Sequence, residues 1–419
     1  MSNQNQHDPF AALRLRSYQL FLTGRVFSLM GYQMQNVAVG WELYERTNSA
    51  LALGVVGLVQ VLPSIVLTLP AGHVADRWDR KRTVLLTQLM LAVGSLGLAF
   101  LSYTQGSIYL IYTFLLLIGV AKAFNQPTTD AWLPQLIPMS VFPNAATWNS
   151  SAFQLASIVG PAIGGFAIAI QKSATGVYIL DAISSLICLA LTAIITGRQT
   201  VRIAETISFK TLAAGFNFVR QQPAILSSIT LDLFAVLLGG AVTLLPIFAR
   251  DILQVGPEGL GWLRAAPSIG AFIMALLFAY LPPLKQAGKT LLWSVAGFGV
   301  VTIIFGLSRS FWLSLLMLGL SGALDNISVI IRHTLVQINT PDHLRGRVSA
   351  INSVFISTSN ELGGFESGFV AALFGPVFSV VSGGIGTIIV VLVVSWIFPQ
   401  LRQLKSLQEE SDQVKSGSW

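Results

Sequence analysis

The sequence predicts an all-α membrane protein of twelve transmembrane helices, arranged as two six-helix bundles around a central cavity. Three observations lead there. Of the 419 residues, 53% are hydrophobic and only 10% are charged; apolar runs of membrane length recur along the chain; and its two halves resemble each other. A soluble domain carries about 25% charged residues, so a water-soluble globular protein is excluded.

Twelve apolar runs are long enough to cross a bilayer, which takes about 20 residues of helix. They lie near residues 17–42, 50–72, 83–104, 107–133, 145–170, 174–196, 224–249, 258–281, 290–308, 311–333, 347–373 and 376–398. The polar start of the chain shows no cleavable signal pattern, and the first run is too long for a signal peptide.

The distribution of Lys and Arg orients these helices. Cations concentrate in the tails and in the loops on the same side of the membrane, whereas the opposite loops hold only Arg46, Lys172, Arg250 and Arg309. Because cytoplasmic loops are enriched in Lys and Arg, both termini are predicted to be cytoplasmic, in an inner or plasma membrane. This spread of charge over many loops also argues against nucleic acid as a partner.

Other chemistry is not indicated. Cys188 is the single cysteine and the four His are scattered, so the sequence predicts no disulfide, no metal site and no cofactor. It has no Gly-x-x-x-x-Gly-Lys-Ser/Thr motif for an ATP-driven pump. Nothing in the spacing of Ser, His and Asp marks a nucleophile, so an enzyme is not expected, and a membrane sensor or enzyme on a transporter-like scaffold is the weakest alternative.

The two halves share short sequence blocks. Val61-Leu-Pro-Ser-Ile65 is echoed by Ala265-Ala-Pro-Ser-Ile269, and a second block beginning at Leu133 recurs at nearly the same offset. Parallel repeats of six helices are typical of transporters whose substrate site lies between the halves near the bilayer midplane. The predicted domains are residues 1–197, a cytoplasmic linker at 198–223 that contains a possible surface helix, and residues 224–419.

Polar residues inside membrane segments mark the predicted cavity, since they avoid lipid. The first segment carries Arg25, Gln33 and Asn36 on one helical stripe. The fourth carries Lys122, Gln126 and Asp130 at successive turns, and the tenth adds Asn326. Arg25 and Lys122 suit an anionic or chelating small molecule.

Four acids in the second half are candidates for proton coupling. In order of preference they are Glu361, Asp325, Asp232 and Glu366. A proton-driven exporter requires an ionisable group in the cavity whose pKa is displaced by burial and whose proton competes with substrate or a nearby cation. Each acid also has a structural interpretation, as a buried ion pair or an interhelical hydrogen bond.

The loop Gly72-His-Val-Ala-Asp-Arg-Trp-Asp-Arg-Lys-Arg82 carries a specific signature. Its pattern Gly-x-Val-Ala-Asp-Arg-x-x-Arg-Lys resembles the loop between segments 2 and 3 of the major facilitator superfamily, with Asp79 in place of the usual Gly. Together with Pro341-x-x-Leu-Arg-Gly-Arg347, it is most similar to the enterobactin-exporter and macrolide-efflux branch. The resemblance covers essentially the whole chain.

A second motif resembles one associated with antiporters of that superfamily. Segment 5 contains Gly160-Pro161-Ala-Ile-Gly164-Gly165, although Ala156 stands where the full motif has a further glycine. The same small residues are fully explained by close helix packing. The similarity favours export over import.

The resemblance implies a function and a conformational latch. In the family, the loop acid caps the start of segment 11 and a loop Arg pairs with an acid at the end of segment 4, which latches the outward-facing state. The residues implied here are Gly72, Asp76, Arg77, Arg80 and Asp130. The expected protein is a monomeric secondary exporter of a siderophore or drug-like amphiphile, in contact with membrane lipid and exchanging substrate for protons by alternating access; the alternative is a lysophospholipid transporter of the same fold.

Overall fold

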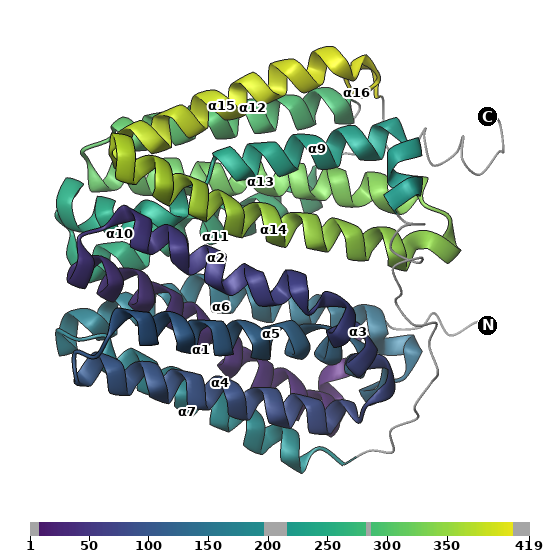
Figure 1. The fold of residues 1–419 in the computed structure, drawn as a ribbon. Helices are drawn as coiled ribbons and strands as arrows, with labels where there is room; N and C mark the ends of the chain where they lie inside the picture. Colours follow the sequence, from purple (N-terminus) through teal and green to yellow (C-terminus); the bar gives the residue numbers. More distant parts are fainter. Residues whose placement is uncertain (1–7, 197–215, 282–285, 405–419) are drawn as a thin grey trace, which may run out of the picture. The chain divides into compact units, whose positions relative to one another are not determined.

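The structure is a computed structural model that describes residues 8–196, 216–281 and 286–404. The described part of the chain is built from helices joined by short turns and contains no strand. Figure 1 shows these helices as long, roughly aligned rods within each part of the molecule. This confirms the all-α prediction.

The helices follow the predicted segments closely. In the first half they are α1 (Arg16–Thr47), α2 (Ala50–Val66), α3 (Thr68–Arg77), α4 (Arg80–Tyr103), α5 (Ile108–Leu136), α6 (Phe142–Gln171) and α7 (Thr175–Ile194). In the second half they are α9 (Pro223–Leu238), η3 (Ala241–Leu244), α10 (Leu245–Ile247), η4 (Phe248–Ile252), α11 (Gly256–Tyr280), α12 (Ala287–Leu307), α13 (Phe311–Asn339), α14 (Asp342–Phe374), α15 (Pro376–Ile397) and α16 (Pro399–Gln403).

By length and composition, nine helical stretches within the described ranges are able to cross a membrane. A tenth is the bent pair Ala50–Val66 and Pro70–Arg77, whose axes differ by 56°. The helices α1 and α14 are longer still, with 32 and 33 residues, but are richer in polar residues. These stretches are consistent with the twelve predicted segments.

The seventh segment departs from a single continuous helix. α9 ends at Leu238, and the chain passes Gly239 and Gly240 before η3, α10 and the π-helical turn η4. A Cβ at Gly240 would lie 2.7 Å from the carbonyl oxygen of Gly363 in α14. The paired glycines therefore allow both the break and the close approach of α14.

Contacts divide the chain into two compact units. Unit 1 comprises 1–39 and 62–207, and unit 2 comprises 40–61 and 208–419. Within unit 1, α4 packs against α5 and α7, and α3 packs against α5. Within unit 2, α12 packs against α13 and α15, α11 against α13, and α9 against α14. The predicted bundle boundaries stay a prediction, and most of the predicted linker 198–223 lies outside the described residues.

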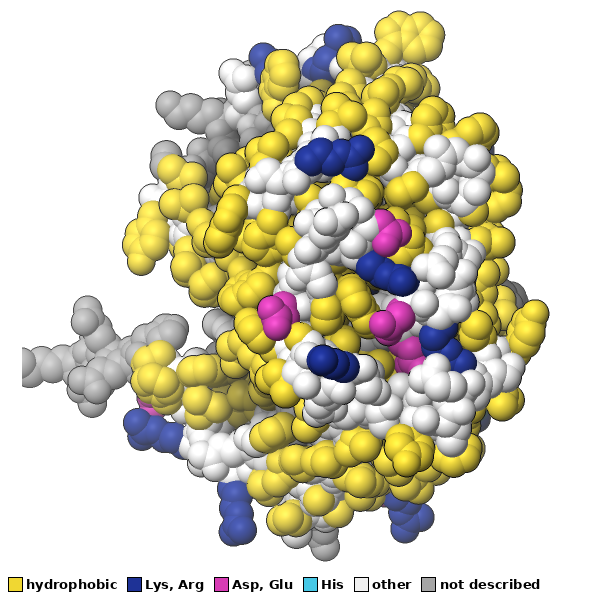
Figure 2. All heavy atoms as spheres, turned by 90° about the vertical axis from the view of Figure 1, so that its left-hand side faces the viewer, with side chains coloured by type: hydrophobic (Ala, Val, Ile, Leu, Met, Phe, Trp, Pro, Cys, Tyr) yellow, Lys and Arg dark blue, Asp and Glu magenta, His cyan; other side chains and the backbone are white. Residues whose placement is uncertain are grey.

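The outside of the protein is strongly apolar. Large hydrophobic side chains on many helices are exposed, among them Phe100, Trp293 and Trp396 at 65%, 76% and 81%. Figure 2 shows one face on which hydrophobic side chains are widespread, with backbone and uncharged side chains between them and a few charged side chains. Exposed apolar surface on this scale fits contact with lipid.

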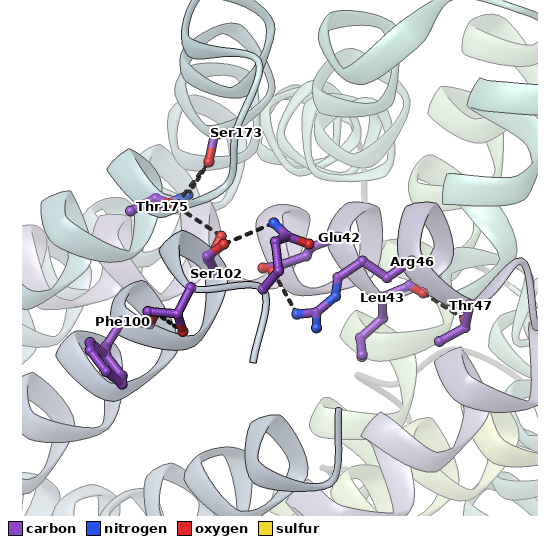
Figure 3. Close-up of polar contacts among 10 residues, drawn as sticks. Glu42, Leu43, Arg46, Thr47, Phe100, Ser102, Ser173 and Thr175 are labelled. Atoms are coloured by element: carbon purple, nitrogen blue, oxygen red, sulfur yellow. Dashed lines mark hydrogen bonds and ion pairs between the residues drawn. The ribbon is translucent and has the colours of Figure 1, made fainter. Parts of the chain in front are cut away.

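Figure 3 draws polar contacts at helix ends in each unit. In unit 2, Arg46 Nη1 lies 3.2 Å from Glu42 Oε1, one helical turn away, and the two side chains are 14% and 6% exposed. In unit 1, Ser173 Oγ donates to Thr175 Oγ1 at 2.8 Å, and Thr175 Oγ1 donates to Ser102 Oγ at 3.0 Å. The second set ties the start of α7 to the end of α4.

Candidate transport site

Unit 1 contains two adjoining polar pockets between α1, α4, α5 and α7. They have about 520 Å³ and 420 Å³ of empty space, including space open to solvent, and they share Ser28, Leu29, Asn125 and Gln126. The space that they enclose in this conformation is only about 80 Å³ and 50 Å³, which holds a few water molecules. Both lie within one unit, among helices that the sequence analysis marked as polar.

Two cations reach these pockets. Lys122 of α5 lines the first, with its Nζ 3.5 Å above the ring centre of Tyr32 from α1. Arg25 of α1 lines the second and lies 3.6 Å from Asp130 through Nη1. The Nε of Arg25 is buried without a hydrogen-bond partner among the described residues, so it is available to an acceptor on a ligand.

Polar amides complete the lining. Gln126 of α5 lines both pockets, and its Nε2 donates to Asp130 Oδ2 at 2.9 Å. Asn125 donates from Nδ2 to Thr87 Oγ1 of α4 at 2.7 Å. The structure therefore brings together three of the residues predicted for the cavity: Arg25, Lys122 and Gln126.

Gln33 and Asn36 are not among the residues that line these pockets. At about 100° per residue, Gln33 is turned roughly 80° from Arg25 around α1, toward α6. There its Nε2 donates to Ser157 Oγ at 2.9 Å, and Asn36 Nδ2 lies 3.5 Å from Gln33 Oε1. Their role in substrate binding stays a prediction.

The segment 5 motif forms the contact between α6 and α1. A Cβ at Gly160 would lie 2.6 Å from the Cβ of Gln33, and a Cβ at Gly164 would lie 3.0 Å from the Cα of Met34. Pro161 and Gly165 are buried beside them. These residues therefore act in close helix packing, whatever further role the motif has in transport.

In unit 2, one candidate acid sits in an ion pair. Asp232 of α9 pairs with Arg332 of α13, and their side chains are 7% and 3% exposed. Asp325 lies two turns before Arg332 on α13 and interacts electrostatically with both members of the pair. The neighbouring Asn326 has a buried Oδ1 without a hydrogen-bond partner in the described part of the chain.

The other two acids lie on α14. Glu361 is half-buried where α14 meets α2: a Cβ at Gly57 would lie 2.8 Å from its carbonyl oxygen and 3.3 Å from its Oε2. Glu366 is half-buried and accepts from Ser367 Oγ at 3.4 Å. Proton coupling by any of the four acids stays a prediction.

The signature loop forms the end of α3 and the start of α4. Arg80 is buried and donates from Nε to the carbonyl oxygen of Ala75 at 2.9 Å. Asp79, at the position where the family pattern has Gly, accepts from the backbone N–H of Arg82 at 2.8 Å and so caps α4. This is the favoured role of Asp at such a position.

The next residues to place are those of the predicted conformational latch. In the described conformation Asp130 lies beside Arg25, while Arg80 is bonded to its own loop. Asp76 has a buried Oδ2 without a hydrogen-bond partner among the described residues. Gly72 is buried and Arg77 is exposed. The resemblance assigns the latch to the outward-facing state, and it stays a prediction.

Sequence reasoning missed the acid of the first pocket. Asp181 of α7 is 4% exposed and lines this pocket with Lys122. Its Oδ2 lies 2.6 Å from Ser95 Oγ of α4, which accepts from Gln35 Nε2 of α1 at 3.2 Å. The signal was present, because Asp181 is the single acid of its membrane segment. Within the described ranges, no group of three His, Cys, Asp or Glu is placed to hold a metal.

Comparison with known proteins identifies relatives along the whole chain. The model of a family described as transmembrane secretion effector matches residues 7–417. The enterobactin exporter EntS of Escherichia coli O1:K1 is 25% identical over 390 residues, covering 93% of each chain. The protein of the same name from Shigella boydii serotype 18 matches equally.

Solved transporter structures share the fold. A bacterial homologue of the human lysosomal transporter Spinster, inward-facing and occupied, superposes with a TM-score of 0.73 at 14% identity, covering 93% of this chain and 98% of that one. A bacterial homologue of the iron transporter ferroportin, inward-facing, gives a TM-score of 0.70 at 16% identity, covering 93% and 99%. At this identity the likeness concerns the fold.

Proposed function

Because the chain belongs to the transmembrane secretion effector family of the major facilitator superfamily, we propose that it exports a siderophore-like chelator from the cytoplasm in exchange for protons. As a multi-pass inner-membrane protein it carries its small-molecule substrate through the bilayer, and both termini are cytoplasmic. The observation that carries the substrate class is the pair of cations, Lys122 and Arg25, in the pockets of unit 1.

Lys122 and Arg25 both keep hydrogen-bond donors that a ligand can use. No carboxylate in the described part of the chain forms an ion pair with Lys122, and Arg25 keeps a buried donor without an acceptor. A charged group in a membrane helix is costly unless it is used. An iron chelator presents several oxygen acceptors, and charge-assisted hydrogen bonds to them are the strong ones. The match with enterobactin exporters supports this class of substrate.

The two ends of α1 fall in different contact units, which supports a transport cycle of alternating access. Residues 40–47 of α1 and 50–61 of α2 belong to unit 2. There Tyr44 donates to Asp251, and Arg250 donates to Asn48 Oδ1 at 2.9 Å. A Cβ at Gly368 of α14 would lie 2.6 Å from Gly54 Cα of α2. We infer that these contacts close the outer side and must open when substrate is released.

The experiment uses the purified protein in proteoliposomes with an imposed pH gradient. Iron-free enterobactin, a lipophilic dye and a lysophospholipid are offered separately. We expect gradient-dependent movement of enterobactin. Lys122→Gln should weaken its apparent affinity about 10- to 100-fold, because one charge-assisted contact contributes about 1.5–3 kcal/mol.

The matched control is Lys289→Gln, which makes the same change at an exposed site on α12. It should leave the affinity for enterobactin as in the wild type. Equal effects of the two variants would contradict the assignment of the pocket. Movement of lysophospholipid alone, indifferent to the gradient, would contradict siderophore export itself.

A further inference from the structure

Asp181 is a buried acid with no place among the acids considered for proton coupling, all of which lie in unit 2. It lies in the second turn of α7, is 4% exposed and lines the first pocket of unit 1. α1 crosses it at Gly31, where a Cβ would collide with its Oδ1. In the described part of the chain it forms no ion pair. Burying an ionised carboxylate inside a membrane helix without a paired cation costs free energy.

The hydrogen bonds around Asp181 are complete when it carries a proton. Ser95 Oγ has three polar neighbours: Asp181 Oδ2 at 2.6 Å, Gln35 Nε2 at 3.2 Å and the carbonyl oxygen of Leu91 at 2.9 Å. A hydroxyl has one hydrogen to donate and two lone pairs. If the acid donates to Ser95, the hydroxyl accepts from Asp181 and Gln35 and donates to Leu91. If the acid is ionised, Ser95 must turn its hydrogen to the carboxylate and the contact with Leu91 is lost.

The ionisable groups near this acid are few. In the lining of the two pockets and on its own helix they are Arg25 and Tyr32 of α1, Lys122 of α5, and Tyr178 and Cys188 of α7. Asp130 of α5 does not line either pocket and lies beside Arg25. α4 carries ionisable side chains only at its ends, and α6 contains none. Lys122 is the cation that shares the first pocket with Asp181, and it rests on the ring of Tyr32.

We propose that Asp181 carries the exchanged proton, an inference that rests on the proposed function as a proton-coupled exporter. In its protonated form the carboxyl group donates to Ser95 Oγ, which lies 2.6 Å from Asp181 Oδ2. When substrate enters the pocket, a hydroxyl or amide N–H of the substrate donates to the carboxylate in place of the proton. The O–H bond of the acid breaks, the proton passes to the water of the pocket, and Lys122 stabilises the carboxylate. Substrate and proton thus exclude one another, as exchange requires.

Two measurements test this role. Asp181→Asn removes the proton site and keeps an amide of the same shape. In proteoliposomes it should still exchange enterobactin across the membrane without a gradient, yet lose gradient-driven accumulation entirely. Asp181→Glu should restore part of the accumulation, and the exposed Glu45→Gln is the matched control, with wild-type accumulation. Full gradient-driven accumulation by Asp181→Asn would overturn the inference.

The second measurement needs no variant and no transport. Dicyclohexylcarbodiimide reacts with protonated carboxyl groups in apolar surroundings. In wild-type protein at neutral pH it should modify the peptide that contains Asp181, as read by mass spectrometry, and added enterobactin should protect that peptide. An unmodified Asp181 would overturn the inference. Failure of the proposed function looks different, because the wild type would then show no gradient-driven movement of enterobactin at all.

Discussion

Asp232 and Arg332 offer a direct test of which acids serve structure. Both side chains are almost fully buried, at 7% and 3% exposed. Breaking a buried pair by removing one partner leaves an uncompensated charge and costs about 3–5 kcal/mol. Asp232→Asn should therefore lower the thermal unfolding temperature in detergent clearly, whereas the exposed Glu45→Gln should leave it unchanged.

A double variant separates the two roles of Asp232. Replacing both partners by apolar residues of similar size, as in Asp232→Leu with Arg332→Met, should recover most of the lost stability, because hydrophobic replacement of a buried pair is often neutral. If Asp232→Asn instead unfolds like the wild type but loses gradient-driven transport, Asp232 is a coupling residue and the structural interpretation is wrong.

The pocket residues also show which parts of the candidate site could be predicted from the sequence and which could not. Arg25, Lys122 and Gln126 were identified because polar side chains recur at helical spacing within apolar segments. Asp181 was missed although it is the single acid of its membrane segment. Its meaning arises from Ser95 and Gln35 on two other helices. The rotation of one helix against another is set by packing, which the periodicity of a single segment does not report.

At the scale of helices, the close packing of α6 on α1 predicts that a larger residue at Gly160 destabilises the protein. Gly160→Ala would place a Cβ 2.6 Å from the Cβ of Gln33, and overpacking of this kind costs about 1–3 kcal/mol. We expect a lower unfolding temperature and a smaller yield of folded protein, measured in detergent by fluorescence-detected unfolding.

The control for this change is another helical glycine with space around it. A Cβ at Gly319 of α13 would meet only the carbonyl oxygen of Ala266, at 3.8 Å. Gly319→Ala should be neutral or slightly stabilising, because Ala favours a helix by about 1 kcal/mol over Gly. Equal stability of the two variants would show that the α1–α6 contact is looser than described.

The limits of the helices were predictable only in their apolar parts. Hydropathy located each membrane segment, yet α1, α5, α13 and α14 run further than the apolar runs, into polar residues that a helix outside the bilayer tolerates. The break after α9 was not predicted. Gly239 and Gly240 lie within an apolar stretch. The mean hydropathy of such a stretch does not distinguish one continuous helix from several short ones.

For the whole molecule, the contact units show that a repeat in sequence does not dictate which helices pack together. The sequence divides near residue 200, whereas residues 40–61 of the first half pack within unit 2. The sequence blocks shared by the two halves indicate that the halves are related and have the same order of helices. The contacts of Gly54 with Gly368 and of Gly57 with Glu361 bring α2 against α14, and the sequence blocks shared by the two halves do not predict them.

Orientation in the membrane is the prediction that concerns the entire chain. Single cysteines are introduced in a Cys188→Ala background and treated with a membrane-impermeant maleimide on intact cells. His73 and Arg309 are suitable positions because both are exposed, His73 in the signature loop and Arg309 in the turn between α12 and α13. With cytoplasmic termini, Arg309→Cys should react in intact cells and His73→Cys only after permeabilisation. The background protein should not react, because Cys188 is the single cysteine of the chain. The reverse pattern would invert the topology, place the signature loop outside, and require the transport assays to be read with the opposite direction of movement.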